Sequence, residues 1–300
     1  MRAFIEKHMS LTFAGFWILG LLIPGIEAIP AQSMMVLLGI VIFLTGFKIQ
    51  FNEITHIHFS RFFLFYALRF IALPIGLYYA MVQFSPVLAL GLLLFGLLPP
   101  AASSPTMSHI FKGNVSLSFA LLILGSFLSP LLIPLIIFFV NQDAIPLDIY
   151  GILQSLVLTI VLPMCLYSIV RKHVPLQNWV KTNGSATSLL LIGMMFTISI
   201  SKHKEIILGS PMSLLLPILV MTGCVLLFYS WGWLFSTRST QTNKVSYVLG
   251  SGSNNVSLGI SIALLYFPAE VSLFLLMSQI PWIFSLTPFK KWAKRIGTQV

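Results

Sequence analysis

The sequence carries one arginine deep inside an apolar segment. Arg69 is the sole charged residue between Phe62 and Tyr79. At about 1.5 Å per residue along a helix, it lies roughly 12 Å beyond Arg61. A charge at such depth in a bilayer costs at least about 2.5–3.5 kcal/mol and typically faces a polar cavity or an anion. Arg69 is therefore a candidate substrate ligand, the alternative being an arginine that snorkels to the membrane surface.

Two clusters of small and polar residues interrupt other apolar runs. The first spans residues 99–106 and the second spans residues 250–255. An unpaired backbone group in hydrocarbon costs several kcal/mol, so a broken helix persists where it lines a cavity or binds something. Free carbonyls and hydroxyls suit a cation, and half-helix N-termini suit an anion. The candidate substrate ligands in and beside these breaks are Ser103, Ser104, Ser108, Ser253, Asn254 and Asn255.

These features also have purely structural explanations that involve no binding. One proline would explain a simple kink in the first segment, which has three, and small residues alone would make the second a helix-packing patch. Gln279, in the last apolar run, serves equally well as a substrate ligand or as an interhelical hydrogen-bonding group.

Catalytic chemistry has little support in the sequence. No Asp or Glu falls near the centre of an apolar run, no Cys/His pattern has metal-ligand spacing, and residues 250–255 lack the Lys-Ser/Thr ending of a phosphate loop. We expect no enzymatic activity, no cofactor and no bound metal.

The composition is that of an integral membrane protein. The chain of 300 residues is 57% hydrophobic and 8% charged, with a mean hydropathy of +0.97. A span needs roughly 20 residues, so there is room for about ten spans and no sizeable soluble domain. The basic residues behind the net charge of +10 lie in short loops beside the apolar runs. They are better explained by the orientation of the chain in the membrane than by a nucleic-acid partner.

Apolar runs that are bounded by charged residues or by proline and glycine predict ten transmembrane helices and an all-α polytopic fold embedded in the lipid bilayer. The predicted spans are residues 10–29, 33–50, 61–82, 86–111, 115–140, 150–170, 185–200, 212–236, 245–267 and 270–289.

Lysines and arginines are distributed unevenly among the predicted loops. With both termini cytoplasmic, Lys202 and Lys204 are the two that fall outside. This predicts a plasma-membrane protein, the inner membrane in a bacterium, with an even number of spans. The breaks fall in the fourth and ninth spans, so the chain divides into two inverted five-helix repeats, a layout common in secondary transporters.

At this point the chain resembles the bile acid:sodium symporter superfamily, in its bacterial type. Residues 98–108 running into 111–118 are similar to the family's broken fourth helix and the turn after it. Residues 69–74 are similar to its Gln-hydrophobic-Pro segment, and residues 254–258 to its Gln-Asn-Ser-Gly-Leu stretch.

The resemblance implies panel and core domains that move against each other in alternating access. The panel would comprise residues 10–55 (helices 1–2) and 148–200 (helices 6–7), and the core residues 60–140 (helices 3–5) and 210–290 (helices 8–10). A small organic anion would bind between them, facing Asn255. Carried over by position, a sodium site would involve Ser104, Ser118, Gly250 and Ser251.

The departures from the family pattern concern the cation. Gly250 stands where the family has a sodium-binding glutamate, Arg69 replaces its glutamine, Pro105 an asparagine and Leu122 a threonine. Each unit of changed charge is worth roughly 3–4 kcal/mol at 4–6 Å and an effective dielectric near 20. We therefore expect sodium to bind poorly or not at all, with Arg69 as a built-in cation. The alternatives are a carrier of the auxin-efflux or malate-permease type and a non-transporting membrane receptor.

Overall fold

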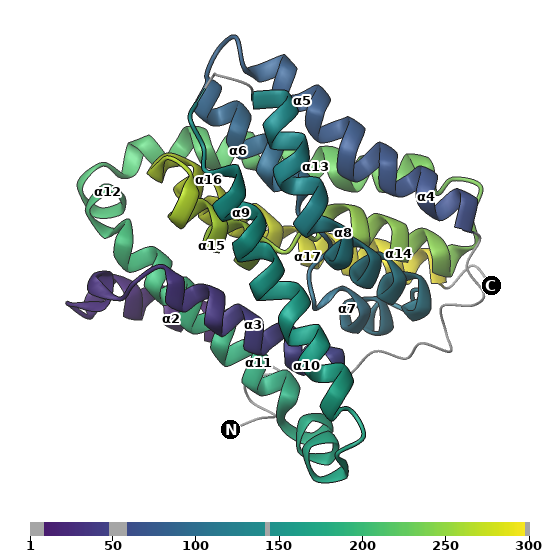
Figure 1. The fold of residues 1–300 in the computed structure, drawn as a ribbon. Coiled ribbons are helices and arrows are strands. Elements are labelled where there is room, and N and C mark those ends of the chain that lie inside the picture. Colours follow the sequence, from purple (N-terminus) through teal and green to yellow (C-terminus); the bar gives the residue numbers. More distant parts are fainter. Residues whose placement is uncertain (1–8, 48–58, 142–144, 298–300) are drawn as a thin grey trace.

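The computed structural model describes residues 9–47, 59–141 and 145–297. All regular structure in these residues is helical, apart from one isolated β-bridge between Pro100 and Asn254. Figure 1 shows two groups of helices that lie side by side.

The smaller group contains α2 (Met9–Leu22), α3 (Gln32–Gly46) and α11 (Val174–Lys202). Helix α11 packs along both α2 and α3. A helix with a π-helical stretch in its middle continues this group beside α3: α9 (Ile149–Leu156), η4 (Val157–Val161) and α10 (Leu162–Val170).

The larger group contains the segments that are interrupted in the sequence. Its uninterrupted helices include α8 (Val115–Asn141) and α13 (Leu215–Phe235), with α16 (Ala269–Met277) and α17 (Gln279–Gly297) at the C-terminal end. One further rod joins α4 (Phe59–Ala67), the π-helical η3 (Leu68–Ala72) and α5 (Leu73–Met81).

The predicted interruptions are present. The segment 86–111 is α6 (Pro86–Leu97) followed by α7 (Ser104–Ile110), and the segment 245–267 is α14 (Gln241–Gly252) followed by α15 (Val256–Tyr266). The residues between each pair, 98–103 and 253–255, are not helical, and we call these two segments the paired breaks.

Six described stretches are long and apolar enough to cross a membrane: Ser60–Met81, Val115–Asn141, Ile149–Val170, Val174–Lys202, Pro211–Phe235 and Ala269–Arg295. Shorter apolar helices cover Thr12–Leu22, Gln32–Gly46, Pro86–Leu97 and Val256–Tyr266. The fold is therefore polytopic and α-helical, while the count of ten spans and the inverted repeat stay predictions.

Several predicted boundaries were wrong. Helix α11 begins at Val174, eleven residues before the predicted start at Ser185, because His173 caps a polar first half that hydropathy does not detect. The first span ends at Leu22 and is followed by a short 3-10 helix, Ile26–Ala28. Residues 48–55 of the predicted panel, and the cytoplasmic assignments of Arg2, Lys7 and Lys48, lie outside the described residues.

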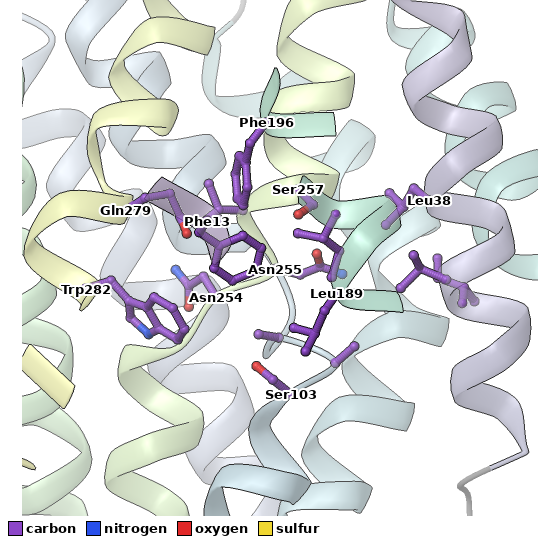
Figure 2. A pocket seen from close by; sticks show the side chains of 16 residues that line it. Phe13, Leu38, Ser103, Leu189, Phe196, Asn254, Asn255, Ser257, Gln279 and Trp282 are labelled. Carbon is purple, nitrogen blue, oxygen red and sulfur yellow. The ribbon is translucent and has the colours of Figure 1, made fainter. Parts of the chain in front are cut away.

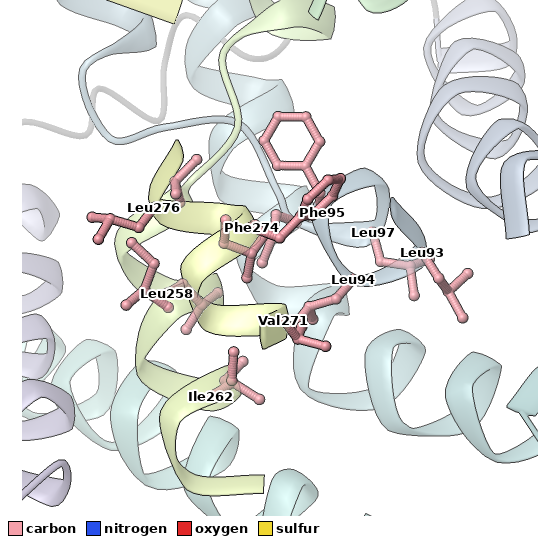
Figure 3. Packing of buried hydrophobic residues seen from close by; sticks show 14 of the residues in the cluster. Leu93, Leu94, Phe95, Leu97, Leu258, Ile262, Val271, Phe274 and Leu276 are labelled. Carbon is pink, nitrogen blue, oxygen red and sulfur yellow. The ribbon is translucent and has the colours of Figure 1, made fainter. Parts of the chain in front are cut away.

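The centre of the larger group is a tightly packed apolar core. Figure 3 shows leucines and Phe95 of α6 meeting Leu258 and Ile262 of α15 and Phe274 of α16. Each of these side chains is buried. Their packing fixes the C-terminal end of α6 and the N-terminal end of α15, which adjoin the two breaks. Their packing holds the paired breaks in position.

Candidate functional site

The paired breaks lie antiparallel and bond to each other through their main chains. The N–H of Ala101 donates to Ser253 O at 2.8 Å, and the N–H of Asn255 donates to Pro99 O at 2.8 Å. Backbone groups that the broken helices leave free are thus partly satisfied within the membrane, as hydrocarbon requires.

Arg69 lies next to these breaks and is fully buried. Its Nε donates to Ser251 O at 2.9 Å and to Ser251 Oγ at 3.0 Å, and its Nη2 donates to Ser251 O at 2.6 Å. Nη2 also donates to Asn254 Oδ1 at 3.0 Å, while Nη1 donates to Gly96 O at 3.1 Å. One guanidinium therefore joins the last turn of α6, the last turn of α14 and the second break.

None of these acceptors is a carboxylate. The carbonyls of Gly96 and Ser251 are C-terminal helix groups, which have no intrahelical partner and carry the negative end of the helix dipole. The guanidinium carbon also lies 3.5 Å from the ring centroid of Phe228 and 4.6 Å from that of Phe70, at cation–π range. Dipoles and aromatic faces thus surround this buried charge.

Local sequence explains how the side chain reaches both helices. Pro74 cannot donate a helical hydrogen bond, and the helix before it widens to a π-turn that contains Arg69, with Leu73 N–H bonding to Leu68 O. A Cβ on Gly96 would lie 2.6 Å from Pro74 Cγ, so glycine permits the close approach of α5 and α6. That approach puts the Gly96 carbonyl within reach of Arg69.

Asn254 completes the connection between the breaks. Its Nδ2 donates to Phe95 O at 2.6 Å while its Oδ1 accepts from Arg69. Ser251 Oγ donates to Phe228 O at 2.6 Å, and Ser253 Oγ accepts from the indole N–H of Trp282 at 3.2 Å.

Of the serines predicted for an ion site, Ser251 bonds to Arg69, whereas Ser104 and Ser118 lie buried on α7 and α8. Ser108 Oγ bonds to Ser118 Oγ and lies 3.4 Å from Ser246 Oγ. Ser104 Oγ is buried with no hydrogen-bond partner in the structure. A Cβ on Gly250 would point at Leu121 Cδ1, 2.9 Å away, so this position faces α8. In the described part of the chain, no three His, Cys, Asp or Glu side chains converge on a metal site.

A cavity of about 90 Å³ separates the breaks from the smaller helix group (Figure 2). Its walls combine apolar side chains of α2, α3 and α11 with residues of the breaks, α15 and α17. The lining residues are Phe13, Leu38, Val41, Ile42, Ala101, Ala102, Ser103, Leu189, Ile192, Phe196, Asn254, Asn255, Val256, Ser257, Gln279 and Trp282.

The structure divides the predicted substrate ligands into two sets. Ser103, Asn254, Asn255 and Gln279 line the cavity. Arg69, Ser104, Ser108 and Ser253 are not among its lining residues, and each is buried elsewhere around the breaks.

The polar wall of the cavity includes a helix N-terminus. No lining residue carries a charge. Helix α15 begins there, with Asn255 Oδ1 accepting from Leu258 N–H, so the positive end of its dipole faces the space. Gln279 is buried, with 8% of its surface exposed, and its side-chain amide points into the cavity in Figure 2.

Sequence reasoning missed Phe13, Phe196, Ser257 and Trp282 as cavity residues. Phe13 and Phe196 meet edge to face at 5.6 Å. Nothing in their local sequence distinguishes them from other apolar residues. Ser257 lies two residues beyond the second break, and that position was a usable signal.

Two polar contacts join the smaller helix group to the larger one, and Glu27 makes further contacts within the smaller group. His203 Nε2 lies 2.9 Å from Ser272 Oγ of α16, and Ser155 Oγ bonds to Tyr266 OH at 2.5 Å. Glu27 accepts from Lys204 at 3.0 Å and from Ser201 at 2.9 Å. A hydrogen bond from its own backbone, with those from Lys204 and Ser201, lowers the pKa of Glu27 to about 2.

These features define a helical membrane protein with a binding cavity at two interrupted helices, an arrangement typical of transporters. The model of the sodium bile acid symporter family matches residues 35–210. The chain belongs to this family, whose members are transporters and not enzymes.

Three relatives have similar sequences. The match to the uncharacterized protein YbaS of Bacillus subtilis is 23% identical and covers 62% of each chain. Sodium/bile acid cotransporter 7 of Mus musculus is 23% identical over 79% of this chain and 74% of its own length. The uncharacterized sodium-dependent transporter YocS of Bacillus subtilis is 22% identical over 87% of this chain and 84% of its own.

Proposed function

We propose that this chain is a secondary transporter of a small organic anion that works by alternating access without sodium, because Arg69 takes the place of the cation. The supporting observation is the set of hydrogen bonds from Arg69 to Gly96 O, Ser251 O and Asn254 Oδ1. Carbonyl and amide oxygens of this kind are ligands for hard cations. Here they accept hydrogen bonds from a guanidinium instead.

Electrostatics favours this assignment over a sodium ion beside Arg69. A second positive charge about 4 Å from the guanidinium would be repelled by roughly 4 kcal/mol at an effective dielectric of 20. Gly250 supplies no carboxylate to offset that repulsion. Two of the relatives carry names that refer to sodium. This chain would differ from a sodium-dependent transporter because its transport would not be coupled to sodium.

The substrate site is the cavity lined by Ser103, Asn254, Asn255 and Gln279. The carboxylate or sulfonate of the substrate would lie at the N-terminus of α15, where the positive end of the helix dipole favours negative charge. The apolar remainder would contact Phe13, Leu38 and Phe196. Its small volume favours a compact substrate.

The panel, with α2, α3, α9–α10 and α11, would move against the core that contains the paired breaks. Both termini would be cytoplasmic, which puts the His203–Ser272 and Ser155–Tyr266 contacts at the external ends of their helices. These bonds would hold the external side closed. They would break when the cavity opens outward.

A thermal-shift screen of small carboxylates and sulfonates, each with sodium or with choline, tests the proposal. A ligand that raises the melting temperature equally in both salts supports it, because a binder of the native state stabilises by mass action. The hit is then tested for uptake into proteoliposomes. Uptake that requires sodium would contradict sodium independence, and binding without uptake would identify a receptor instead.

A further inference from the structure

A groove of about 310 Å³ lies between α13 and α17, away from the cavity at the paired breaks. On α13 it is lined by Leu226, Tyr229, Ser230 and Trp233, which recur at helical spacing and form one stripe. The facing stripe on α17 runs from Ser285 to Trp292. Each stripe spans eight residues, so the groove is roughly 10 Å long and runs parallel to the helices.

The groove stays open because its two helices carry small or kinked positions. Pro288 lies inside α17 and lines the groove, as do the serines of both stripes. Deeper in, Tyr229 stacks on Phe289 with ring centroids 5.6 Å apart. This stack forms a rigid floor, so the groove is a built feature of the packing.

The groove faces hydrocarbon. Its walls belong to two stretches with the length and composition of membrane spans, Pro211–Phe235 and Ala269–Arg295. Leu226 is 58% exposed and Trp233 is 46% exposed on the surface of the protein. An apolar chain, not water, is therefore the natural occupant of this groove.

One end of the groove is strongly basic. Trp292, an aromatic residue of the kind that collects at membrane interfaces, is followed and preceded by exposed lysines and an arginine. These are Lys290, Lys291, Lys294 and Arg295, and α17 contains no acidic residue. Phe289 and Ala293 in the same turns of α17 are buried, whereas these four basic residues are exposed.

We propose that this groove binds one anionic phospholipid, with an acyl chain between α13 and α17 and the phosphate at Lys290 and Lys291. Charge complementarity selects the lipid. Each lysine or arginine near an anionic headgroup adds about 1 kcal/mol, and a zwitterionic lipid offers no net charge to attract them. The site is separate from the substrate cavity and does not depend on what the protein transports.

Native mass spectrometry of the full chain, purified in mild detergent and titrated with phosphatidylglycerol or phosphatidylcholine, tests the proposal. We expect the wild type to retain one phosphatidylglycerol, with at least about tenfold preference over phosphatidylcholine. The double variant K290Q/K291Q loses that preference. The matched control R171Q/K172Q removes an adjacent exposed pair at the α10–α11 loop and keeps it.

A second variant separates the groove from its basic end. Ser230→Phe fills the groove at an exposed position and leaves every charge in place. We expect it to lose the retained lipid while its melting temperature stays near that of the wild type. Equal retention in Ser230→Phe, equal affinity in K290Q/K291Q, or displacement of the lipid by inorganic phosphate alone would each overturn the proposal.

Discussion

The guanidinium of Arg69 donates two hydrogen bonds to one oxygen atom, the main-chain carbonyl of Ser251, at 2.9 and 2.6 Å. Ser251 lies in the last turn of α14, beside the second break, so this carbonyl has no helical N–H to accept from. The relationship gives a buried arginine a structural role at the paired breaks.

Arg69→Gln should destabilise the protein. The substitution leaves Gly96 O and Ser251 O buried without their donor, and each unsatisfied group costs about 1–3 kcal/mol. A fall in melting temperature of several degrees is the expected result. Arg61→Gln is the matched control on the same helix rod, since Arg61 makes one hydrogen bond, to Phe235 O, and is partly exposed. Equal melting temperatures for the two variants would remove the structural role from Arg69.

Gln279→Glu should weaken anion binding without unfolding the protein. The added negative charge would lie in an uncharged cavity, facing the position proposed for the substrate carboxylate. We expect at least about a tenfold loss of affinity for any anion found by thermal shift, equivalent to about 1.4 kcal/mol. Gln279→Leu, the neutral control, should weaken binding less. Unchanged affinity in Gln279→Glu would place the anion elsewhere.

The contact between Glu27 and Lys204 should persist across the physiological pH range. Because the pKa of Glu27 is lowered from 4.5 to about 2, its contribution is fully present above pH 4.5 and is lost as the pH falls through about 2. The difference in melting temperature between wild type and Glu27→Gln should thus be constant from pH 8 to pH 5 and shrink in acid. Glu205→Gln serves as the control. A difference that disappears between pH 7 and pH 5 would show that the contact is not formed.

The proposed orientation predicts opposite labelling at two exposed residues. In a variant lacking Cys165 and Cys224, a cysteine at Glu205 should react with an impermeant maleimide added to intact cells. A cysteine at Arg238, in the loop between α13 and α14, should react only after the membrane is permeabilised. The reverse labelling pattern would show that both termini lie outside the cytoplasm.

The sequence was sufficient to predict where the helices break and which charge lies among them. Prolines, glycines and adjacent asparagines are costly inside a lipid-embedded helix, and a lone arginine is costlier still, so each stands out locally. The class of fold and the family followed from the same residues.

The partners of Arg69 could not be predicted from local sequence. Its acceptors lie 27, 182 and 185 residues away and are mostly backbone carbonyls, which every residue has. The apolar wall of the cavity was equally hidden, because Phe13 and Phe196 have the same side chain as many lipid-facing phenylalanines. Their placement depends on how α2 and α11 pack.

The start of α11 was missed for a different physical reason. Its first turns carry Gln177, Asn178 and Lys181, which hydropathy reads as a loop. His173 accepts from the Leu176 N–H at 3.3 Å, and Pro175 occupies the first turn, so the local capping signals were present. Capping chemistry, rather than hydropathy, locates the beginning of this helix.

The most direct test of the central claim is the sodium dependence of the melting temperature in the wild type and in the double variant Arg69→Gln/Gly250→Glu. The variant removes the guanidinium and adds a carboxylate that points toward α8, where Leu121 must move to admit it. At a sodium concentration ten times the Kd, binding adds about 1.4 kcal/mol of stability. If Arg69 replaces the cation, the wild type melts at the same temperature in sodium and in choline chloride, and the double variant melts higher in sodium. Sodium-dependent stabilisation of the wild type would contradict the account.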